Sequence, residues 1–390
     1  MFDYIIVGAG FSGSVIAERI ANVLHKKVLI IEKRNHIGGN AFDRFNQEGL
    51  MIHQYGPHIF HTKLKYIWDY VSQFAEWHYY HHRVLASIDG QQVSIPFNLQ
   101  ALQDLLPSGL AQELEDKLVR QFGHGVKVPI LKLRETEDRD LRWLAEFIYE
   151  KVFLHYTTKQ WGMTPEELDP MVTGRVPVFI SKDDRYFQDA YQGMPKLGYT
   201  AVFEGMLRHS NIKIMLNTDY KELLEVDSGT QSIRFMGRAF EGQLIYTGKI
   251  DELFNYEYGE LPYRSLRFEF ETLQQEKFQN TGTVNYPNEY DFTRITEFKH
   301  LTGQKHPYTA IVREYPQAYD RQRTGQDVPY YPIPKSENQE RYSQYVQKAK
   351  QMSQLILLGR LAEYKYYDMD ACIAKALKVF EDRIAGRQEN

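Results

Sequence analysis

The sequence predicts an α/β fold in three parts: a βαβ domain of the nucleotide-binding kind, a helical insertion and an antiparallel sheet domain. Three observations support this class. A glycine-rich turn follows the first apolar run, helical patterns fill residues 98–162, and strand-like segments gather in residues 251–339. No internal repeat or low-complexity linker interrupts the chain.

The first element is the stretch IIVGAGFSG, an apolar run that ends in three closely spaced glycines. Residues 4–7 fit a buried strand, Gly8 allows a tight turn, Gly10 lets the backbone approach a pyrophosphate, and Gly13 lets the next helix pack closely. The helix pattern is followed by the apolar strand VLII and then Glu32, whose carboxylate can accept from ribose hydroxyls. We therefore predict a Rossmann-like βαβ unit that binds a dinucleotide.

The residues after Glu32 favour FAD over a nicotinamide cofactor. In EKRNHIGGN, Gly38 and Gly39 place bare amides beside the nucleotide, and Asn40 adds a side-chain donor. An extended FAD molecule must also touch later segments, and YGPHIFHT with His58 is the first that qualifies.

The second such segment is LILLGRLAEYKYYDMDACIAKALKVF near the C-terminus. Its apolar start fits a strand, and the spacing of its later apolar residues predicts a helix capped by Asp368 or Asp370. A helix N-terminus aimed at a flavin would favour negative charge on the reduced ring.

The remaining patterns assign the rest of the chain. VLASIDGQQVSIPFNL predicts a hairpin with its turn at Asp89 and Gly90. QLIYTG predicts a strand that returns to the nucleotide domain, so the domains are discontinuous. The predicted domains are residues 1–76, 195–250 and 340–390 for FAD binding, 98–162 for the helical insertion, and 77–97, 163–194 and 251–339 for the antiparallel sheet and substrate domain.

Composition narrows the possible functions. With 43% apolar residues and no long apolar run, the chain is expected to be a globular protein that does not span a membrane. The start MFDYIIVG lacks a signal peptide, and the single cysteine, Cys372, excludes an intramolecular disulfide, so we expect a cytoplasmic protein. A net charge of −4 gives no global attraction for nucleic acid, so local arginines must hold any anionic ligand. The histidines of HYYHHR lack acidic or cysteine partners, so no metal site is expected.

Several segments together carry a family resemblance. GAGFSG, EKRNHIGGNAF, YGPHIFHT, YTTKQWG, YFQDAYQGMPKLGYT, TRITEFKH, PYYPI and GRLAEYKYYDMD occur in this order. Over nearly the whole chain the sequence resembles the bacterial UDP-galactopyranose mutases. The resemblance implies an isomerase that interconverts UDP-galactopyranose and UDP-galactofuranose on non-covalently bound FAD, which must be reduced by a cellular flavin reductant. It implies that flavin N5 attacks the anomeric carbon, UDP leaves, and the sugar ring opens through an iminium and recloses, with no net redox change. It also implies a homodimer.

The resemblance also implies the roles of individual residues. The residues expected to bind FAD are Gly8, Gly10, Phe11, Ser12, Gly13, Glu32, Lys33, Gly39, Asn40, Pro57, His58, Arg360, Tyr367, Asp368 and Met369. The residues expected to bind the sugar nucleotide are His82, Phe153, Tyr156, Thr157, Trp161, Arg175, Tyr186, Arg264, Asn285, Arg294, Tyr331 and Tyr366. The residues expected to act in catalysis are Arg175, Arg294 and His58, the two arginines on the pyrophosphate and the histidine against the flavin. Guanidinium groups suit this role because their fixed donors match phosphate oxygens.

Two positions depart from the family pattern, and one segment is expected to move. Family members commonly have asparagine where this chain has His82, and some have a second aromatic residue where it has Val152. The segment VTGRVPV, with Arg175 near its centre, is expected to be a mobile lid because Gly174 supplies permissive torsions.

Two other functions share part of the pattern. A flavin oxidase or monooxygenase would keep the βαβ unit without needing phosphate arginines, and oxygen consumption with a bound substrate would identify it. A non-enzymatic protein resembling the inhibitors that bind prenylated small GTPases would keep the architecture without flavin. A yellow purified protein would argue against this second alternative.

Overall fold

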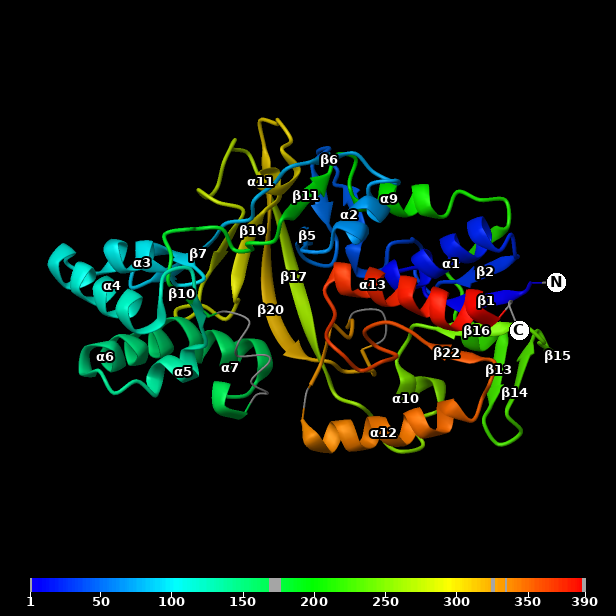
Figure 1. Cartoon of the computed structure of the whole chain (residues 1–390). Coiled ribbons are helices and arrows are strands. Elements are labelled where there is room, and N and C mark those ends of the chain that lie inside the picture. The colour runs from blue at the N-terminus through cyan, green and yellow to red at the C-terminus, as the bar shows by residue number, and fades with distance from the viewer. Residues whose placement is uncertain (1, 168–176, 324–326, 334, 388–390) are drawn as a thin grey trace.

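The computed structural model of the chain describes residues 2–167, 177–323, 327–333 and 335–387. Within them, two large sheets organise the molecule, one parallel with five strands and one mixed with seven. Figure 1 shows the helical region at one end, the parallel sheet with its helices at the other, and the long strands of the mixed sheet between them. The predicted α/β class is confirmed, whereas the division into three domains stays a prediction.

The parallel sheet forms the nucleotide-binding part. Its strands, from edge to edge, are β12 (Ile212–Met215), β2 (Val28–Ile31), β1 (Tyr4–Val7), β16 (Gln243–Tyr246) and β22 (Leu355–Leu357). β1 and β2 are buried along their whole length, as expected for parallel strands covered on both faces. The predicted βαβ unit and the predicted returning strand are therefore confirmed.

Side chains alternate along each strand, so the parallel sheet has two apolar faces, and helices cover both of them. Ile6 and Ile30 face one hydrophobic core, whereas Ile5 and Leu29 face another. The first core contains α1 (Phe11–Val23), α2 (Lys65–Val71), α9 (Tyr199–Met206) and α13 (Met369–Val379). The second contains α10 (Ile250–Leu253), α12 (Ser336–Lys350), β13 (Leu224–Asp227) and β14 (Ser232–Phe235).

The mixed sheet supplies the walls of a second site. Its strands, in spatial order, are β21 (Tyr331–Pro332), β17 (Tyr263–Leu273), β20 (Thr309–Ala318), β19 (Arg294–Glu297), β18 (Thr283–Asn285), β7 (Val84–Ile88) and β8 (Gln91–Ile95). The predicted hairpin is β7–β8, with Asp89 at φ 49 and Gly90 at φ 83 in its turn. One pairing, β18 with β7, is parallel and departs from the predicted antiparallel pattern.

The helical insertion packs on the β7–β8 hairpin through its own hydrophobic core. Its elements are α3 (Leu99–Leu105), α4 (Ser108–Phe122), α5 (Ile130–Arg134), α6 (Arg139–Ile148), η2 (Tyr149–Leu154), α7 (His155–Trp161), η3 (Pro165–Glu167), β9 (Lys127–Val128) and β10 (Val178–Phe179). A wider π turn at η2 joins α6 to α7, and such turns often occur beside functional sites.

Short elements complete the described chain. They are β3 (Asp43–Phe45), β4 (Met51–His53), β5 (Phe60–Thr62), β6 (Trp77–His78), β11 (Tyr191–Pro195), β15 (Arg238–Ala239), α11 (Phe298–Thr302), η1 (Gly39–Ala41), η4 (Tyr220–Glu222), η5 (Phe380–Ile384) and η6 (Ala385–Arg387). No helix among the described residues has the length and apolar character needed to cross a bilayer.

Candidate active site

A first cavity runs along the carboxyl edge of the parallel sheet. Its lining takes one segment after every strand: Thr218 after β12, Glu32 after β2, Gly8 after β1, Thr247 after β16 and Gly359 after β22. Neighbouring strands lie about 4.8 Å apart, so the two outer strands are about 19 Å apart. A cavity with this span, at the edge where open α/β sheets bind ligands, suits a dinucleotide.

The turn between β1 and α1 brings bare backbone to this cavity. Gly8 has φ +102, and a Cβ on Gly13 would lie 2.0 Å from the carbonyl oxygen of Gly8. α1 begins after Gly10, which has no side chain to cap the helix. The first amides of α1 therefore remain available to a phosphate.

Glu32 follows β2 and is almost fully buried beside the same turn. One carboxylate oxygen accepts from the amide of Ala9 at 2.9 Å, and the other accepts from the amide of Arg34 at 2.9 Å. An ionised carboxylate offers about four acceptor positions. The geometry is thus compatible with the predicted bond to ribose hydroxyls.

A second glycine loop touches the first. Gly38 and Gly39 have φ +94 and +56, and a Cβ on Gly39 would lie 2.9 Å from the Cα of Gly10. Asn40 accepts from Arg34 Nη2 at 3.0 Å and also lines the cavity. These two loops form a cradle of backbone amides that a side chain at any of these glycines would fill. Such a cradle fits a pyrophosphate.

The C-terminal segment closes the other end of the cavity. Arg360 donates to the carbonyl oxygens of Tyr367 and Tyr330 and lies beside the rings of Tyr331 and Tyr366. Asp368 occupies the cap position of α13, but its side chain makes no hydrogen bond to the helix amides, so the predicted capping interaction is wrong there. Asp370 instead accepts from the amide of Ala371 at 2.7 Å.

Most residues predicted to bind FAD line this first cavity. Those that do are Gly8, Gly10, Phe11, Ser12, Gly13, Glu32, Lys33, Gly39, Asn40, His58, Arg360 and Met369. Pro57 and Asp368 line a second cavity instead, and Tyr367 meets Arg360 through its backbone.

The second cavity lies against the mixed sheet and meets the first at His58, Arg360 and Met369, which line both. The predicted substrate residues that line it are His82, Tyr156, Tyr186, Asn285, Arg294, Tyr331 and Tyr366. They come from β18, β19, β21, α7 and connecting segments that lie far apart in the sequence.

His58 is a neutral imidazole where the cavities meet. Its Nδ1–H donates to the carbonyl oxygen of Gly56 at 2.8 Å, and its backbone N–H donates to Nδ1 of His53 at 3.0 Å. Burial lowers the pKa of His58 to about 3. Because the carbonyl fixes the proton on Nδ1, Nε2 is left as an acceptor.

Arg294 is the charged centre of the second cavity. Its Nε donates to Oε1 of Glu314 at 2.7 Å, and the two residues lie opposite each other on β19 and β20. Burial opposes the charge, yet Glu314 and nearby tyrosines raise the pKa of Arg294 well above its ordinary value. The guanidinium therefore stays ionised, with its remaining donors available to an anion.

Tyrosine hydroxyls surround this guanidinium. Burial raises the pKa of Tyr156, Tyr186 and Tyr331, so all three remain protonated at neutral pH. Tyr331 stacks on Tyr366 with centroids 5.5 Å apart and contacts Trp161 at 6.0 Å. The cavity thus combines cationic, hydroxyl and aromatic groups, the chemistry that a nucleotide sugar requires.

Other predicted substrate residues lie outside the cavity lining. Phe153 packs in the core of the helical insertion. Arg264 donates to the carbonyl oxygens of Gln160 and Lys159, at 2.9 and 3.1 Å, and so holds the end of α7 on β17. Thr157 and Trp161 are half-buried on α7 without lining the cavity. Arg175 and most of the predicted lid segment lie outside the described residues.

Several residues that line the second cavity were absent from the predicted site, and Glu314 and His61 are two of them. Glu314 sits in a strand-like stretch where nothing local marks it, because its partner Arg294 is 20 residues away and meets it only through strand pairing. His61 carried a weak signal, since it follows His58 in the segment already assigned to the flavin.

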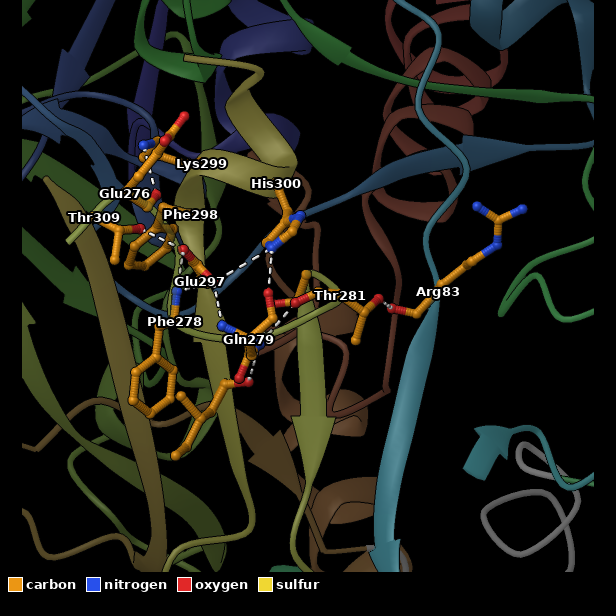
Figure 2. Close-up of polar contacts among 12 residues, drawn as sticks. Arg83, Glu276, Phe278, Gln279, Thr281, Glu297, Phe298, Lys299, His300 and Thr309 are labelled. Carbon is orange, nitrogen blue, oxygen red and sulfur yellow. Dashed lines mark hydrogen bonds and ion pairs between the residues drawn. The ribbon is translucent and has the colours of Figure 1, made fainter. Parts of the chain in front are cut away.

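The strand that carries Arg294 is anchored at its other end by a buried carboxylate. Figure 2 shows Glu297 at the centre of this network. Glu297 accepts from the backbone amides of Phe278 and Gln279, from the hydroxyl of Thr309 at 2.6 Å, and lies 3.3 Å from Nε2 of His300. Burial opposes its ionisation, but these hydrogen bonds outweigh burial and lower the pKa of Glu297 to about 2.

We expect Glu297→Gln to destabilise the protein in a pH-dependent way. A depressed carboxyl pKa adds stability that is fully present above about pH 4.5 and is lost as the pH falls toward about 2. The variant should lose about 3 kcal/mol of unfolding free energy at pH 7. Urea denaturation from pH 7 down to pH 3 should show the gap to the wild type narrowing below pH 4.5. Glu276→Gln, at an exposed side chain between β17 and β18, is the control, and a difference in stability that stays constant with pH would contradict the assignment.

Comparisons with known proteins agree with this geometry. The family model described as UDP-galactopyranose mutase matches residues 151–366, and that of an NAD(P)-binding Rossmann-like domain matches residues 6–74. A probable UDP-galactopyranose mutase of Klebsiella pneumoniae is 37% identical over 99% of this chain and 97% of its own length. A dTDP-fucopyranose mutase of Escherichia coli is 34% identical over 100% of both chains. The crystal structure of a reduced UDP-galactopyranose mutase superposes with a TM-score of 0.73 at 15% identity, covering 100% of this chain and 95% of that one.

Proposed function

The chain belongs to the UDP-galactopyranose mutase family, and from this membership we propose that it interconverts UDP-galactopyranose and UDP-galactofuranose on bound, reduced FAD. The observation that carries the proposal is the meeting of the two cavities at His58, Arg360 and Met369. A flavin seated in the first cavity would present its ring to a sugar held in the second.

The chemistry of the cofactor is that of a nucleophile. Bound in reduced form, FAD would supply a nucleophilic lone pair on N5 toward the anomeric carbon, and the reaction would be redox-neutral although the cofactor must be reduced. Gly8, Gly10 and Gly13 would hold its pyrophosphate, and Glu32 would hold the ribose next to it.

The residues of the second cavity would manage the departing nucleotide. When the bond between the anomeric carbon and the diphosphate breaks, negative charge collects on the diphosphate. Arg294 supplies a permanent cation there, and Tyr331 supplies a protonated hydroxyl. Donors already fixed where charge develops stabilise the transition state more than the ground state.

The deciding experiment compares two redox states of one protein. Dithionite-reduced protein is incubated with UDP-galactofuranose, and the products are separated by chromatography. We expect conversion to UDP-galactopyranose only in the reduced sample, with the oxidised sample still binding the nucleotide. Equal turnover in both samples would contradict the role of reduced N5, and oxygen consumption on substrate addition would favour a flavin oxidase.

A second substrate is favoured by one comparison. A dTDP-fucopyranose mutase matches all of this chain, and this chain has His82 lining the cavity where the resembling mutases commonly have asparagine. dTDP-fucopyranose is therefore the alternative substrate. Competition between the two nucleotide sugars in one reaction would give the ratio of their kcat/KM values directly.

Three further properties follow from the resemblance. We propose that the protein is a cytoplasmic homodimer and that a cellular flavin reductant activates it. Light scattering of the purified protein tests the dimer, and reconstitution with a cell extract and NAD(P)H under anaerobic conditions tests the reductant.

A further inference from the structure

His61 presents its ring to the second cavity while its strand neighbours face the core. Along β5, Phe60 and Thr62 are fully buried, whereas His61 lies between them on the opposite face and lines the cavity. Alternation along a strand fixes this direction. The ring stacks on Phe187, with centroids 3.6 Å apart and planes 15° apart.

A carboxylate orients this ring. Nδ1 of His61 lies 2.6 Å from Oδ2 of Asp189. The hydrogen bond from His61 is the largest influence on Asp189 and lowers the pKa of that carboxyl despite its partial burial. An ionised carboxylate only accepts, so the proton of this bond belongs to Nδ1 and Nε2 is the second site of the ring.

The position of Asp189 is itself fixed. Gln192, on β11 directly opposite His61, donates from its side-chain amide to the carbonyl oxygens of Phe187 at 3.1 Å and Asp189 at 2.8 Å. Gln192 is fully buried, so the turn that carries Phe187 and Asp189 is tied to the sheet.

We propose that His61, oriented by Asp189, is the proton carrier of the ring contraction. The inference rests on the proposed function. When the C1–O5 bond opens, its electron pair goes to O5, which must gain a proton. When O4 bonds to C1 with its own electron pair, O4 must lose a proton. Protonated Nε2 can donate to O5 and then take the proton of O4, so the net reaction leaves His61 unchanged.

The other histidines at the cavity are less suited to this task. Burial lowers the pKa of both His58 and His82 to about 3, so neither carries a proton near neutral pH. Among the described residues, the charged and titratable groups around the His61–Asp189 pair include Lys63, 4.0 Å from Asp189, Lys127 on β9, and His82, on which His61 acts. Asp183 in turn acts on Lys127. Arg294 acts on His82 across the cavity.

The test uses the reduced holoenzyme and two substitutions in which the new side chain is close in size to the one it replaces. His61→Gln keeps a polar side chain that cannot carry a proton, and Asp189→Asn keeps the shape but removes the charge. His300→Gln breaks a second histidine–carboxylate pair, the one with Glu297 that Figure 2 shows. This pair lines neither cavity, so the variant is the matched control.

We expect His61→Gln to lower kcat by about 10²- to 10³-fold with KM changed less than threefold, because general acid–base catalysis contributes 10²–10⁴. Asp189→Asn should lower kcat by roughly 10- to 100-fold and enlarge the solvent deuterium isotope effect. His300→Gln should leave kcat within twofold. A readout independent of turnover is the downfield proton resonance of His61 Nδ1–H in ¹⁵N-histidine protein. It should be lost in His61→Gln and moved in Asp189→Asn, while UDP affinity stays unchanged in both.

Two results would overturn the proposal. One is a kcat within twofold of the wild type in both variants. The other is a loss of UDP or substrate affinity that accounts for the whole loss of kcat/KM, since His61 would then only bind. The wild-type protein is assayed in parallel. If it fails to isomerise either substrate, the proposed function itself is refuted, and this outcome is distinct from the two above.

Discussion

Arg294→Ala should lower kcat/KM for UDP-galactofuranose by about 10³-fold or more. The guanidinium is expected to make charge-assisted hydrogen bonds to the diphosphate, each worth about 1.5–3 kcal/mol. Its loss also leaves Glu314 as a buried carboxylate without its partner, beside the place where an anionic substrate must bind. Repulsion therefore adds to the lost attraction, and about 4 kcal/mol corresponds to a 10³-fold effect.

A double variant separates these two causes. Arg294→Ala combined with Glu314→Gln removes the buried charge, so it should recover thermal stability and part of the binding without recovering kcat. Arg294→Lys should recover only part of the rate, because an ammonium lacks the planar fork of donors. The control is Arg313→Ala, since Arg313 precedes Glu314 on β20 but faces outward to Glu271. An Arg294→Ala variant with near-wild-type turnover at low substrate concentration would exclude any role for this cation.

Gly13→Val should yield a colourless, inactive protein. A Cβ at this position would lie 2.0 Å from the carbonyl oxygen of Gly8, so the turn that binds the pyrophosphate cannot keep its shape. The absorbance ratio of flavin to protein in the purified variant measures the effect, and we expect a loss of at least tenfold.

Gly10→Ala tests the same loop without disturbing the protein. The nearest atom to a Cβ there is the Cα of Gly39 at 3.7 Å, which is an ordinary contact, so the added methyl group intrudes only on the ligand. This variant should keep its circular dichroism spectrum yet bind flavin weakly. Gly109→Ala on α4, where a Cβ meets nothing within 4 Å, should keep both. If Gly13→Val keeps its full flavin content, the assignment of the glycine turn to the cofactor site is wrong.

Local patterns were sufficient to predict the parts of the fold that local chemistry determines. The turn at Gly8–Gly13, the helix that follows it and the hairpin turn at Asp89 all lie where the sequence places them. Each depends on neighbouring residues alone, through torsions that glycine permits or through the period of apolar side chains.

Contacts between distant segments could not be predicted in the same way. Arg264 is a weaker candidate for the sugar nucleotide, and in the structure it donates to carbonyl oxygens at the end of α7. Phe153 is expected to bind the sugar nucleotide, which stays a prediction, and its place in the core of the helical insertion could not be seen from the sequence. Glu314 became visible only once the register of β19 and β20 was known. The partner of Arg264 is 104 residues away and that of Glu314 is 20 residues away, so no local periodicity could predict either contact.

The order of strands in the parallel sheet has a consequence for synthesis of the chain. β1 pairs with β16, some 240 residues later, and the sheet is complete only when β22 at Leu355–Leu357 has been made. At 5–20 residues per second, the ribosome needs roughly 20–70 seconds to proceed from β1 to β22. The glycine loops are therefore made long before Arg360 and α13, which complete the cavity beside them. Cofactor capture should therefore follow the synthesis of this segment, so nascent chains truncated before β22 should emerge without flavin.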